Sequence, residues 1–386
     1  MSFRRQLTSI TILNRPVLVA ENSYRISVQP CPDTPQLKSV WQQLESRAEA
    51  NFFLSWHWIS TWLEAYQPNA QLLCIKNAET IVGLGLLVKH RQYRYGLLKS
   101  EQLYLHQTGK PKEDQIWIEY NGLLHDQSQS DAITKAAFAH LSAQYSGWDE
   151  CVLGAITQHQ ANLITASLNV YSDELWAANS YCVDLQLLRD NNRQYLDSLS
   201  ANTRGQIRKS IREYQAIGEL QLRPAASIEQ AQAFFDQAAP IHQARWGSAA
   251  GESGFANPEF IRFHRLLINN NWAKGFVNLY QLTVNEEVLG FFYNFIYQGR
   301  VYFYLSALQE SAQPKLKPGL VGHCLLIQHY IEQGLASYDF LGGDARYKKS
   351  LATVSGRLIQ VRLQKKCWKY ALENWAKKIK RTRISP

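Results

Sequence analysis

The chain has 386 residues, of which 46% are hydrophobic, 12% are aromatic and 19% are charged, and its formal net charge is +9. A chain of this length and composition can bury two sizeable cores, which excludes an intrinsically disordered protein. No apolar run approaches the roughly 20 residues that a membrane-spanning helix requires, and the first residues lack the apolar segment of a signal peptide. We therefore expect a cytoplasmic enzyme without a transmembrane segment.

The sequence also lacks several signatures of catalysis. None of the six cysteines has a partner at the close spacing of a metal or redox motif, so we predict no metal site. Gly-x-Ser-x-Gly, His-Glu-x-x-His and Walker-type motifs are absent, which leaves hydrolases, metalloproteases and nucleotide triphosphatases without their usual support. Cys324 next to His323 is a candidate nucleophile pair, although adjacent residues on a helix point in different directions.

The first half of the chain is predicted to contain both helices and strands. Helices at 36–50 and 55–66 precede strands at 71–75, 81–89, 98–104 and 115–120, and a helix at 131–143 and a strand at 150–153 follow. Residues 171–179 are predicted to link this half to the next.

The second half has a similar make-up. A helix from residue 200 ends at Gly218, and a strand near Leu220, helices at 228–246 and 258–271, and strands at 277–283, 288–297 and 300–305 follow. A helix from Pro318 to Gly334 and a strand at 335–341 complete this half. Helices, an antiparallel meander, and then a helix and a strand are compatible with one α/β domain in each half.

Two neighbouring strands of the second half are dense in aromatic residues and meet at a hairpin signal, Gln298-Gly299-Arg300. Most of these rings are expected in the core. Tyr293, Tyr302 or Tyr304 could instead line a groove for a substrate, because alternation alone does not tell which side of the sheet faces a cleft.

The helix that begins near residue 200 has arginines along one side. Arg204, Arg208 and Arg212 recur at every fourth position, and apolar residues occupy another face. Stacked guanidinium groups repel one another unless an anion or carboxylates lie nearby. This face therefore either binds an anionic group or is solvated and neutralised by acids such as Glu213.

The helix that begins near Pro318 predicts a phosphate cradle. Gly319 and Gly322 allow other atoms to approach the backbone closely, and a helix N-terminus offers free amides and a positive dipole end. Lys315 and Lys317 add positive charge before the helix. The alternative is that these lysines are ordinary surface residues.

Residues 338–349, Tyr-Asp-Phe-Leu-Gly-Gly-Asp-Ala-Arg-Tyr-Lys-Lys, combine a strand end with groups that can transfer protons. Two consecutive glycines end the strand sharply. Asp339 lies in the strand, Asp344 just beyond it, and Tyr347 and Lys348 follow where a turn would present them toward a cleft. The alternative is a solvated turn whose aspartate caps a short helix.

In this order, these segments resemble the CelD/BioF-like branch of the GNAT acyltransferase superfamily, which is close to the FemABX peptidyltransferases. The resemblance spans residues 36–364 and includes the phenylalanine-rich turn and tryptophan-bearing helix at 51–65. It departs from the family in two places. Leu351 replaces a common tryptophan, and the pyrophosphate loop survives only as Lys317, Gly319 and Gly322.

The resemblance implies an α/β (α+β) fold of two tandem GNAT-like domains, each a mixed, largely antiparallel sheet flanked by helices. The domains would be residues 1–175 and 176–364, the second being the acyltransferase, with residues 365–386 as a basic amphipathic helix. The implied activity is N-acyl transfer to an amine of a cell-envelope or polysaccharide precursor. Acetyl-CoA or another acyl-CoA would be the co-substrate, with no tightly bound cofactor, and aminoacyl-tRNA, the donor of FemABX-like relatives, stays open.

The resemblance also implies roles for residues. Lys348 matches the family's lysine and would stabilise developing negative charge, Asp344 or Asp339 would act as base or orient the amine, and Tyr347 would donate a proton. The expected contacts to the donor's phosphates are Lys317, Gly319, Gly322, Arg204 and Arg208.

Positive charge is concentrated near the C-terminus. Residues 345–386 contain 13 Lys and Arg against one acid, whereas the rest of the chain has a net charge of −3. Residues 365–381 predict a helix with Trp368, Leu372, Trp375 and Ile379 on one stripe. The tryptophans either dock on the protein while lysines face water, or form an interfacial or anion-binding surface. The alternative function is therefore a non-catalytic GNAT-like protein whose tail recruits an anionic partner such as RNA or lipid head groups.

Overall fold

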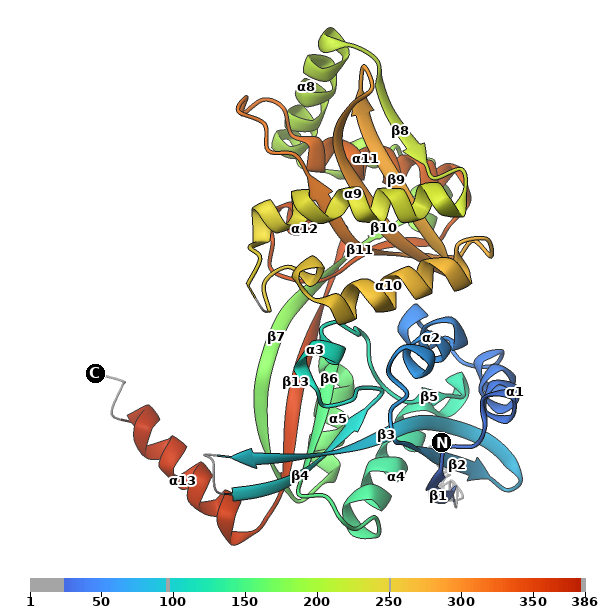
Figure 1. The fold of residues 1–386 in the computed structure, drawn as a ribbon, viewed down its shortest axis with the longest axis vertical. Helices are drawn as coiled ribbons and strands as arrows, with labels where there is room; N and C mark the ends of the chain where they lie inside the picture. Colours follow the sequence, from blue (N-terminus) through green and yellow to red (C-terminus); the bar gives the residue numbers. More distant parts are fainter. Residues whose placement is uncertain (1–23, 95–97, 250, 383–386) are drawn as a thin grey trace, which may run out of the picture.

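The computed structural model describes residues 24–94, 98–249 and 251–382, which form two lobes that share one sheet (Figure 1). The sheet has thirteen strands among these residues, in the order β1-β2-β3-β4-β6-β13-β7-β12-β11-β10-β9-β8, and β5 pairs with β3. The predicted mixed α/β fold is confirmed, but the two expected sheets are joined edge to edge.

The elements of the first half are β1 (Tyr24–Pro30), α1 (Thr34–Glu45), η1 (Phe52–Leu54), α2 (Trp56–Tyr66), β2 (Ala70–Asn77), β3 (Thr80–Arg94), β4 (Leu98–Leu105), α3 (Pro111–Asp114), β5 (Leu124–His125), η2 (Gln127–Gln129), α4 (Ser130–Ala143), β6 (Glu150–Thr157), α5 (Gln158–Ser167) and β7 (Val170–Asp184). Those of the second half are α6 (Leu185–Asp190), α7 (Tyr195–Ser198), α8 (Ala201–Ile217), β8 (Leu220–Pro224), α9 (Ile228–Trp246), η3 (Gly254–Ala256), α10 (Pro258–Asn271), β9 (Val277–Val284), β10 (Glu287–Tyr297), β11 (Arg300–Leu308), α11 (Pro318–Glu332), β12 (Ser337–Gly342), α12 (Arg346–Leu351), β13 (Val354–Lys365) and α13 (Trp368–Thr382).

The two halves repeat one order of elements. In the first, β1, α1, α2, β2, β3 and β4 precede α4 and β6; in the second, β8, α9, α10, β9, β10 and β11 precede α11 and β12. Each half has one parallel pair, β4 with β6 and β11 with β12, and its other pairs within the half are antiparallel. The crossover helices α4 and α11 therefore occupy equivalent positions.

The halves exchange their long final strands. β7 follows the first half but pairs with β12 of the second, and β13 follows the second half but pairs with β6 of the first. The two strands also pair with each other and run between the lobes (Figure 1). Residues 171–179, which are predicted to link the halves, lie within β7, so the chain passes between the lobes as a paired strand. The division into domains at residue 175 stays a prediction. The paired strands β7 and β13 cross between the two lobes.

The strand predicted at 115–120 is also wrong. These residues form a loop after α3, and Trp117 and Tyr120 adopt left-handed φ angles of 45° and 49°, which a strand does not allow. The sequence also missed β7 as a strand, β13 and the short helix α12.

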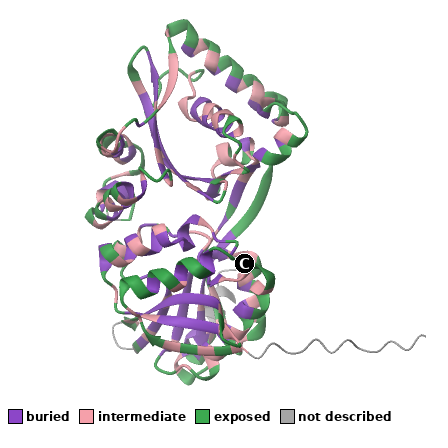
Figure 2. Cartoon of the chain, turned by 90° about the vertical axis from the view of Figure 1, so that its right-hand side faces the viewer, coloured by how far each residue is buried: buried purple, intermediate pink, exposed green. Residues whose placement is uncertain are grey.

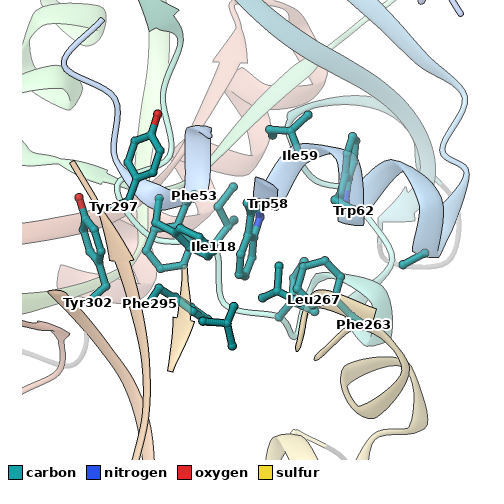
Figure 3. Packing of buried hydrophobic residues seen from close by; sticks show 14 of the residues in the cluster. Phe53, Trp58, Ile59, Trp62, Ile118, Phe263, Leu267, Phe295, Tyr297 and Tyr302 are labelled. Atoms are coloured by element: carbon teal, nitrogen blue, oxygen red, sulfur yellow. The ribbon is translucent and has the colours of Figure 1, made fainter. Parts of the chain in front are cut away.

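One hydrophobic core contains residues from both halves. Phe52 stacks on Phe295 with ring centroids 4.4 Å apart. Trp58 meets Phe263 edge-on, with centroids 4.8 Å apart (Figure 3). Two further cores lie within the separate lobes, and exposed residues gather on the outer faces of the helices (Figure 2). Among the described residues, no helix combines the length and apolar character needed to cross a bilayer.

Candidate active site

The carboxyl end of β12 is a strained turn. Leu341 has a left-handed φ of 61°, an unfavourable conformation for a non-glycine residue. Surrounding side chains hold it in place: the Leu341 N–H donates to Asp339 Oδ1 at 2.7 Å, and the Gly342 N–H donates to Glu119 Oε2 at 2.6 Å. Two carboxylates therefore fix the backbone at the point where β12 ends.

Lys348 lies beside these carboxyl groups and donates from Nζ to the Gly342 carbonyl at 2.6 Å. Burial raises the pKa of Glu119 to about 7 and that of Asp339 to about 6, although hydrogen bonds and the charge of Lys348 oppose the rise. Burial also lowers the pKa of Lys348, against the attraction of the carboxylates. Groups whose pKa lies near neutral pH are suited to moving protons.

The first half of the chain supplies part of this site. Tyr120 donates from its hydroxyl to Asp339 Oδ2 at 2.8 Å, and its own carbonyl accepts from Asn51 Nδ2 at 2.9 Å. The sequence interpretation missed Glu119 and Tyr120 because it placed them in a strand. A single glutamate in the otherwise apolar run at 116–120 is the signal that could have identified them.

A cavity of about 560 Å³ opens between the halves and reaches Asp339. Residues from both halves line it, among them Asn51, Tyr120, Arg300, Tyr302 and Asp339. Lys348 and Glu119 are not among its lining residues, so Asp339 is the ionisable group of the cluster that the cavity exposes. Of the three candidate tyrosines, Tyr302 lines the cavity, whereas Tyr293 and Tyr304 are hydrogen-bonded to the buried His264.

Asp344 and Tyr347 have different surroundings. Asp344 is exposed and accepts from the Asn179 backbone N–H at 3.2 Å and from Asn179 Nδ2 at 2.7 Å, which ties the turn to β7. The Tyr347 ring stacks on that of His323, with centroids 5.3 Å apart, beside the core of the second lobe. Neither residue lines the cavity.

Cys324 and His323 do not form a nucleophile pair in this structure. Burial raises the pKa of the Cys324 thiol to about 11, and His323 Nδ1 lies 3.0 Å from the Tyr338 hydroxyl. A buried thiol of raised pKa is a poor nucleophile.

The start of α11 packs against α8. The Lys317 N–H donates to Ser210 Oγ at 2.8 Å, and Lys317 Nζ donates to Gln206 Oε1 at 2.7 Å. No side chain of the described residues caps the first turn of α11, so its orphan amides stay available.

The two arginines predicted to bind phosphate lie on α8. Arg204 and Arg208 approach Asp197 at 3.8 Å and 3.5 Å, and Arg208 is exposed. Asp197 is therefore a counter-ion to both, and neither contact is close enough to fix the guanidinium groups in one geometry.

The two glycines of α11 differ in their surroundings. A β-carbon at Gly322 would lie 2.2 Å from Cζ of Phe292, so this glycine lets the helix pack on the sheet. A β-carbon at Gly319 would meet only Leu308 Cδ1, at 3.0 Å. The structure thus places Gly319 in the open first turn and Gly322 against the core.

The parallel strands next to each crossover helix diverge: β11 and β12 next to α11, and β4 and β6 next to α4. β11 pairs with β12 only over residues 300–302, and β4 pairs with β6 only over residues 102–104. In the first half, the buried Asn121 bridges the divergent strands, donating from its backbone N–H to Ala155 O at 3.2 Å and from Nδ2 to Leu105 O at 2.8 Å.

Comparisons with known proteins agree with this description. Residues 201–349 match the profile of the acetyltransferase (GNAT) domain family Acetyltransf_6. Among solved structures the fold is similar to FemX, with a TM-score of 0.57 and 11% identity over 86% of this chain and 96% of that chain. It is also similar to L-PGS from Bacillus licheniformis, with a TM-score of 0.51 and 10% identity over 89% and 96% of the two chains. No curated protein matches the sequence.

Proposed function

We propose that the protein transfers an acyl or aminoacyl group to an amine, on the premise that residues 201–349, which match the acetyltransferase (GNAT) domain family, form an acyltransferase domain. The observation that supports the proposal most is the cluster of Asp339, Glu119 and Lys348 at the end of β12, with Asp339 facing a cavity. Attack of an amine on a carbonyl requires proton removal and stabilisation of an oxyanion, and these residue types supply both.

Asp339 is proposed as the base that orients the amine and accepts its proton. It lines the cavity, and its raised pKa of about 6 leaves it ionised, yet basic, near neutral pH. Lys348 is proposed, through its match to the family's lysine and its place beside Asp339, to stabilise the negative charge of the tetrahedral intermediate, for which its Nζ would have to leave the Gly342 carbonyl. Glu119 is proposed as a positioning residue, because it holds the Gly342 N–H while Lys348 binds the carbonyl of the same residue.

Asp344 and Tyr347 stay candidates only through their match to the family motif. The hydrogen bonds of Asp344 to Asn179 and the stacking of Tyr347 on His323 favour structural roles for both.

The donor is proposed to bind at the first turn of α11. The uncapped amides, Gly319 and Lys317 would contact its phosphates, and Arg204 and Arg208 on the neighbouring α8 would add long-range attraction. An acyl-CoA is the expected donor, and aminoacyl-tRNA is the alternative. The gap between β4 and β6 is bridged by Asn121, which supports placing the donor site in the second half of the chain.

The acceptor is proposed to enter the cavity between the halves. Arg300, which pairs with Glu49 at 2.6 Å, and the ring of Tyr302 form part of its wall. An amine on a saccharide or cell-envelope precursor is the acceptor that the family resemblance suggests, and the cytoplasmic location stays a prediction of the same kind.

The test is transfer of a radiolabelled acyl group from acetyl-CoA, longer acyl-CoAs and aminoacyl-tRNA to a panel of amino sugars and amino acids. Lys348→Ala is expected to lower kcat by about 100-fold or more, the typical loss when an oxyanion donor is removed. Asp339→Asn should abolish the rise of rate with pH through about 6. Lys349→Ala, at the exposed neighbouring position, is the matched control. A folded Lys348→Ala protein that turns over at the wild-type rate would overturn the assignment.

A non-catalytic binding function is the second candidate, and the exposed tryptophans of α13 favour it. It would require that no donor supports transfer to any amine, while binding to an anionic partner is salt-sensitive and vanishes when residues 366–386 are removed.

A further inference from the structure

The C-terminal helix α13 turns its apolar stripe away from the protein. Trp368, Leu372 and Trp375 are 72%, 57% and 63% exposed, whereas Tyr370 and Glu373 on the opposite side are 2% and 9% exposed. The interpretation in which the tryptophans dock on the protein is therefore wrong. Ile379, the fourth member of the predicted stripe, lies outside the residues whose side chains the structure describes.

Buried polar contacts fix α13 in this orientation. The Tyr370 hydroxyl lies 2.9 Å from Ser100 Oγ on β4. Arg94 on β3 binds Glu150 on β6 at 2.8 Å and also forms an ion pair with Glu373 of the helix. Glu150 is fully buried, so this network is shielded from water, and a rotated helix would withdraw Glu373 from its ion pair with Arg94.

Two further contacts hold the same side of α13. Lys369 Nζ lies 2.8 Å from Asp149 Oδ2, and Asn374 Nδ2 donates to Gln364 Oε1 of β13 at 3.2 Å. The helix is thus attached to the protein through its polar face and exposes its apolar face. An ordinary surface helix packs its apolar face on the protein instead.

A stripe of large apolar side chains that stays exposed to solvent indicates an interaction surface. The charge of the helix and its flanks indicates the kind of partner: residues 365–386 contain eight basic residues and one acid, and that acid, Glu373, is buried in the ion pair with Arg94. Tryptophan and leucine on one face with lysines beside them is the composition of helices that lie in the interface of an anionic bilayer.

We propose that α13 binds the surface of an anionic lipid bilayer, with Trp368, Leu372 and Trp375 inserted at the level of the head groups. A leucine between two tryptophans forms a continuous apolar strip, which suits acyl chains better than the separate stacking positions that single-stranded nucleic acid uses. The high positive charge disfavours a second copy on the same face. α13 projects from the end of the first lobe (Figure 1), so it can contact a bilayer without covering the cavity between the lobes. This inference does not depend on the transfer reaction.

The experiment is sedimentation of the full chain with vesicles of phosphatidylcholine alone or with phosphatidylglycerol. The wild type should bind the anionic vesicles, bind less as salt rises, and show a blue shift of tryptophan fluorescence. Trp368→Ser with Trp375→Ser should weaken binding by about tenfold or more, equivalent to about 1.4 kcal/mol. The matched control is Trp246→Ser, which removes a tryptophan of 55% exposure on α9 and should leave binding unchanged.

Four outcomes would overturn the proposal. The first is a wild type that does not bind anionic vesicles, and the second is a double variant that binds them like the wild type. In the third outcome, the wild type binds single-stranded RNA but not vesicles, and the double variant no longer binds the RNA. That result would assign the helix to nucleic acid. In the fourth outcome, light scattering shows that the wild type is a dimer and the double variant a monomer, and neither binds vesicles. That result would assign the apolar stripe of α13 to contact with a second copy of the chain. Circular dichroism of the double variant checks that it folds, since the substituted side chains are exposed.

Discussion

At the scale of single residues, the structure makes a carboxyl group of the first half part of a site in the second. Glu119 accepts from the backbone of Gly342, 223 positions away in the chain, and burial raises its pKa to about 7. Because this contact depends on tertiary structure, no local pattern predicts it. The sequence could place Lys348 near Asp339, since both belong to one contiguous motif in which a glycine pair predicts a sharp turn.

The raised pKa of Glu119 predicts a dependence of stability on pH. Between its ordinary value of 4.5 and about 7, the folded protein binds this proton more tightly than the unfolded chain, so the free energy of unfolding falls as pH rises through that interval. Glu119→Gln keeps a carbonyl oxygen for the Gly342 N–H but has no charge to bury. Melting temperatures from pH 4.5 to 8 should therefore decline less steeply in this variant.

Glu79→Gln is the control for that series, because Glu79 is an exposed partner of Arg25. An equal slope for Glu119→Gln and the wild type would show that Glu119 does not hold its proton near neutral pH.

At the scale of elements, the two glycines of α11 make separable predictions. Gly322→Ala would place a β-carbon 2.2 Å from the Phe292 ring and should lower the free energy of unfolding by about 1–3 kcal/mol. Gly205→Ala, on α8 with nothing within 4 Å of the new β-carbon, should raise it by about 0.5–1 kcal/mol. Urea unfolding measures both, and a neutral or stabilising Gly322→Ala would contradict the packing role.

Among the elements, the sequence predicts the helices α9 and α10 correctly but does not predict the strand β7. α9 and α10 agree with their predicted bounds because caps and apolar periodicity are local signals: Ser227 and Asn257 accept from the first turns, and Pro258 begins α10. For β7 the sequence predicts a linker and no strand, because its first ten residues mix polar, acidic and apolar residues without alternation. It is a strand because β12 and β13 pair with its two edges, and those partners lie more than 150 residues away.

At the scale of the whole molecule, the exchanged strands and the shared core make the halves one folding unit. A fragment of residues 176–364 would lose β6, the partner of β13, together with the start of β7 and the side of the core that carries Phe52. We expect this fragment not to fold, whereas the full chain should unfold in one cooperative transition. Circular dichroism melts of both proteins test this, and a fragment with its own sharp transition would show that the second half is autonomous.

The central claim concerns the whole molecule as well: the donor binds at the first turn of α11, and the cavity between the halves meets it at Asp339. The most direct measurement is calorimetric titration of coenzyme A, acyl-CoAs and an aminoacyl-tRNA into the wild type and Gly319→Asp, with Gly319→Ala as the matched control. Alanine adds the same β-carbon against Leu308 without a negative charge. The account predicts that the wild type binds one of these donors, that Gly319→Ala retains most of the affinity, and that Gly319→Asp loses it. Equal affinity of Gly319→Asp and Gly319→Ala, or no binding of any donor by the wild type, would contradict it.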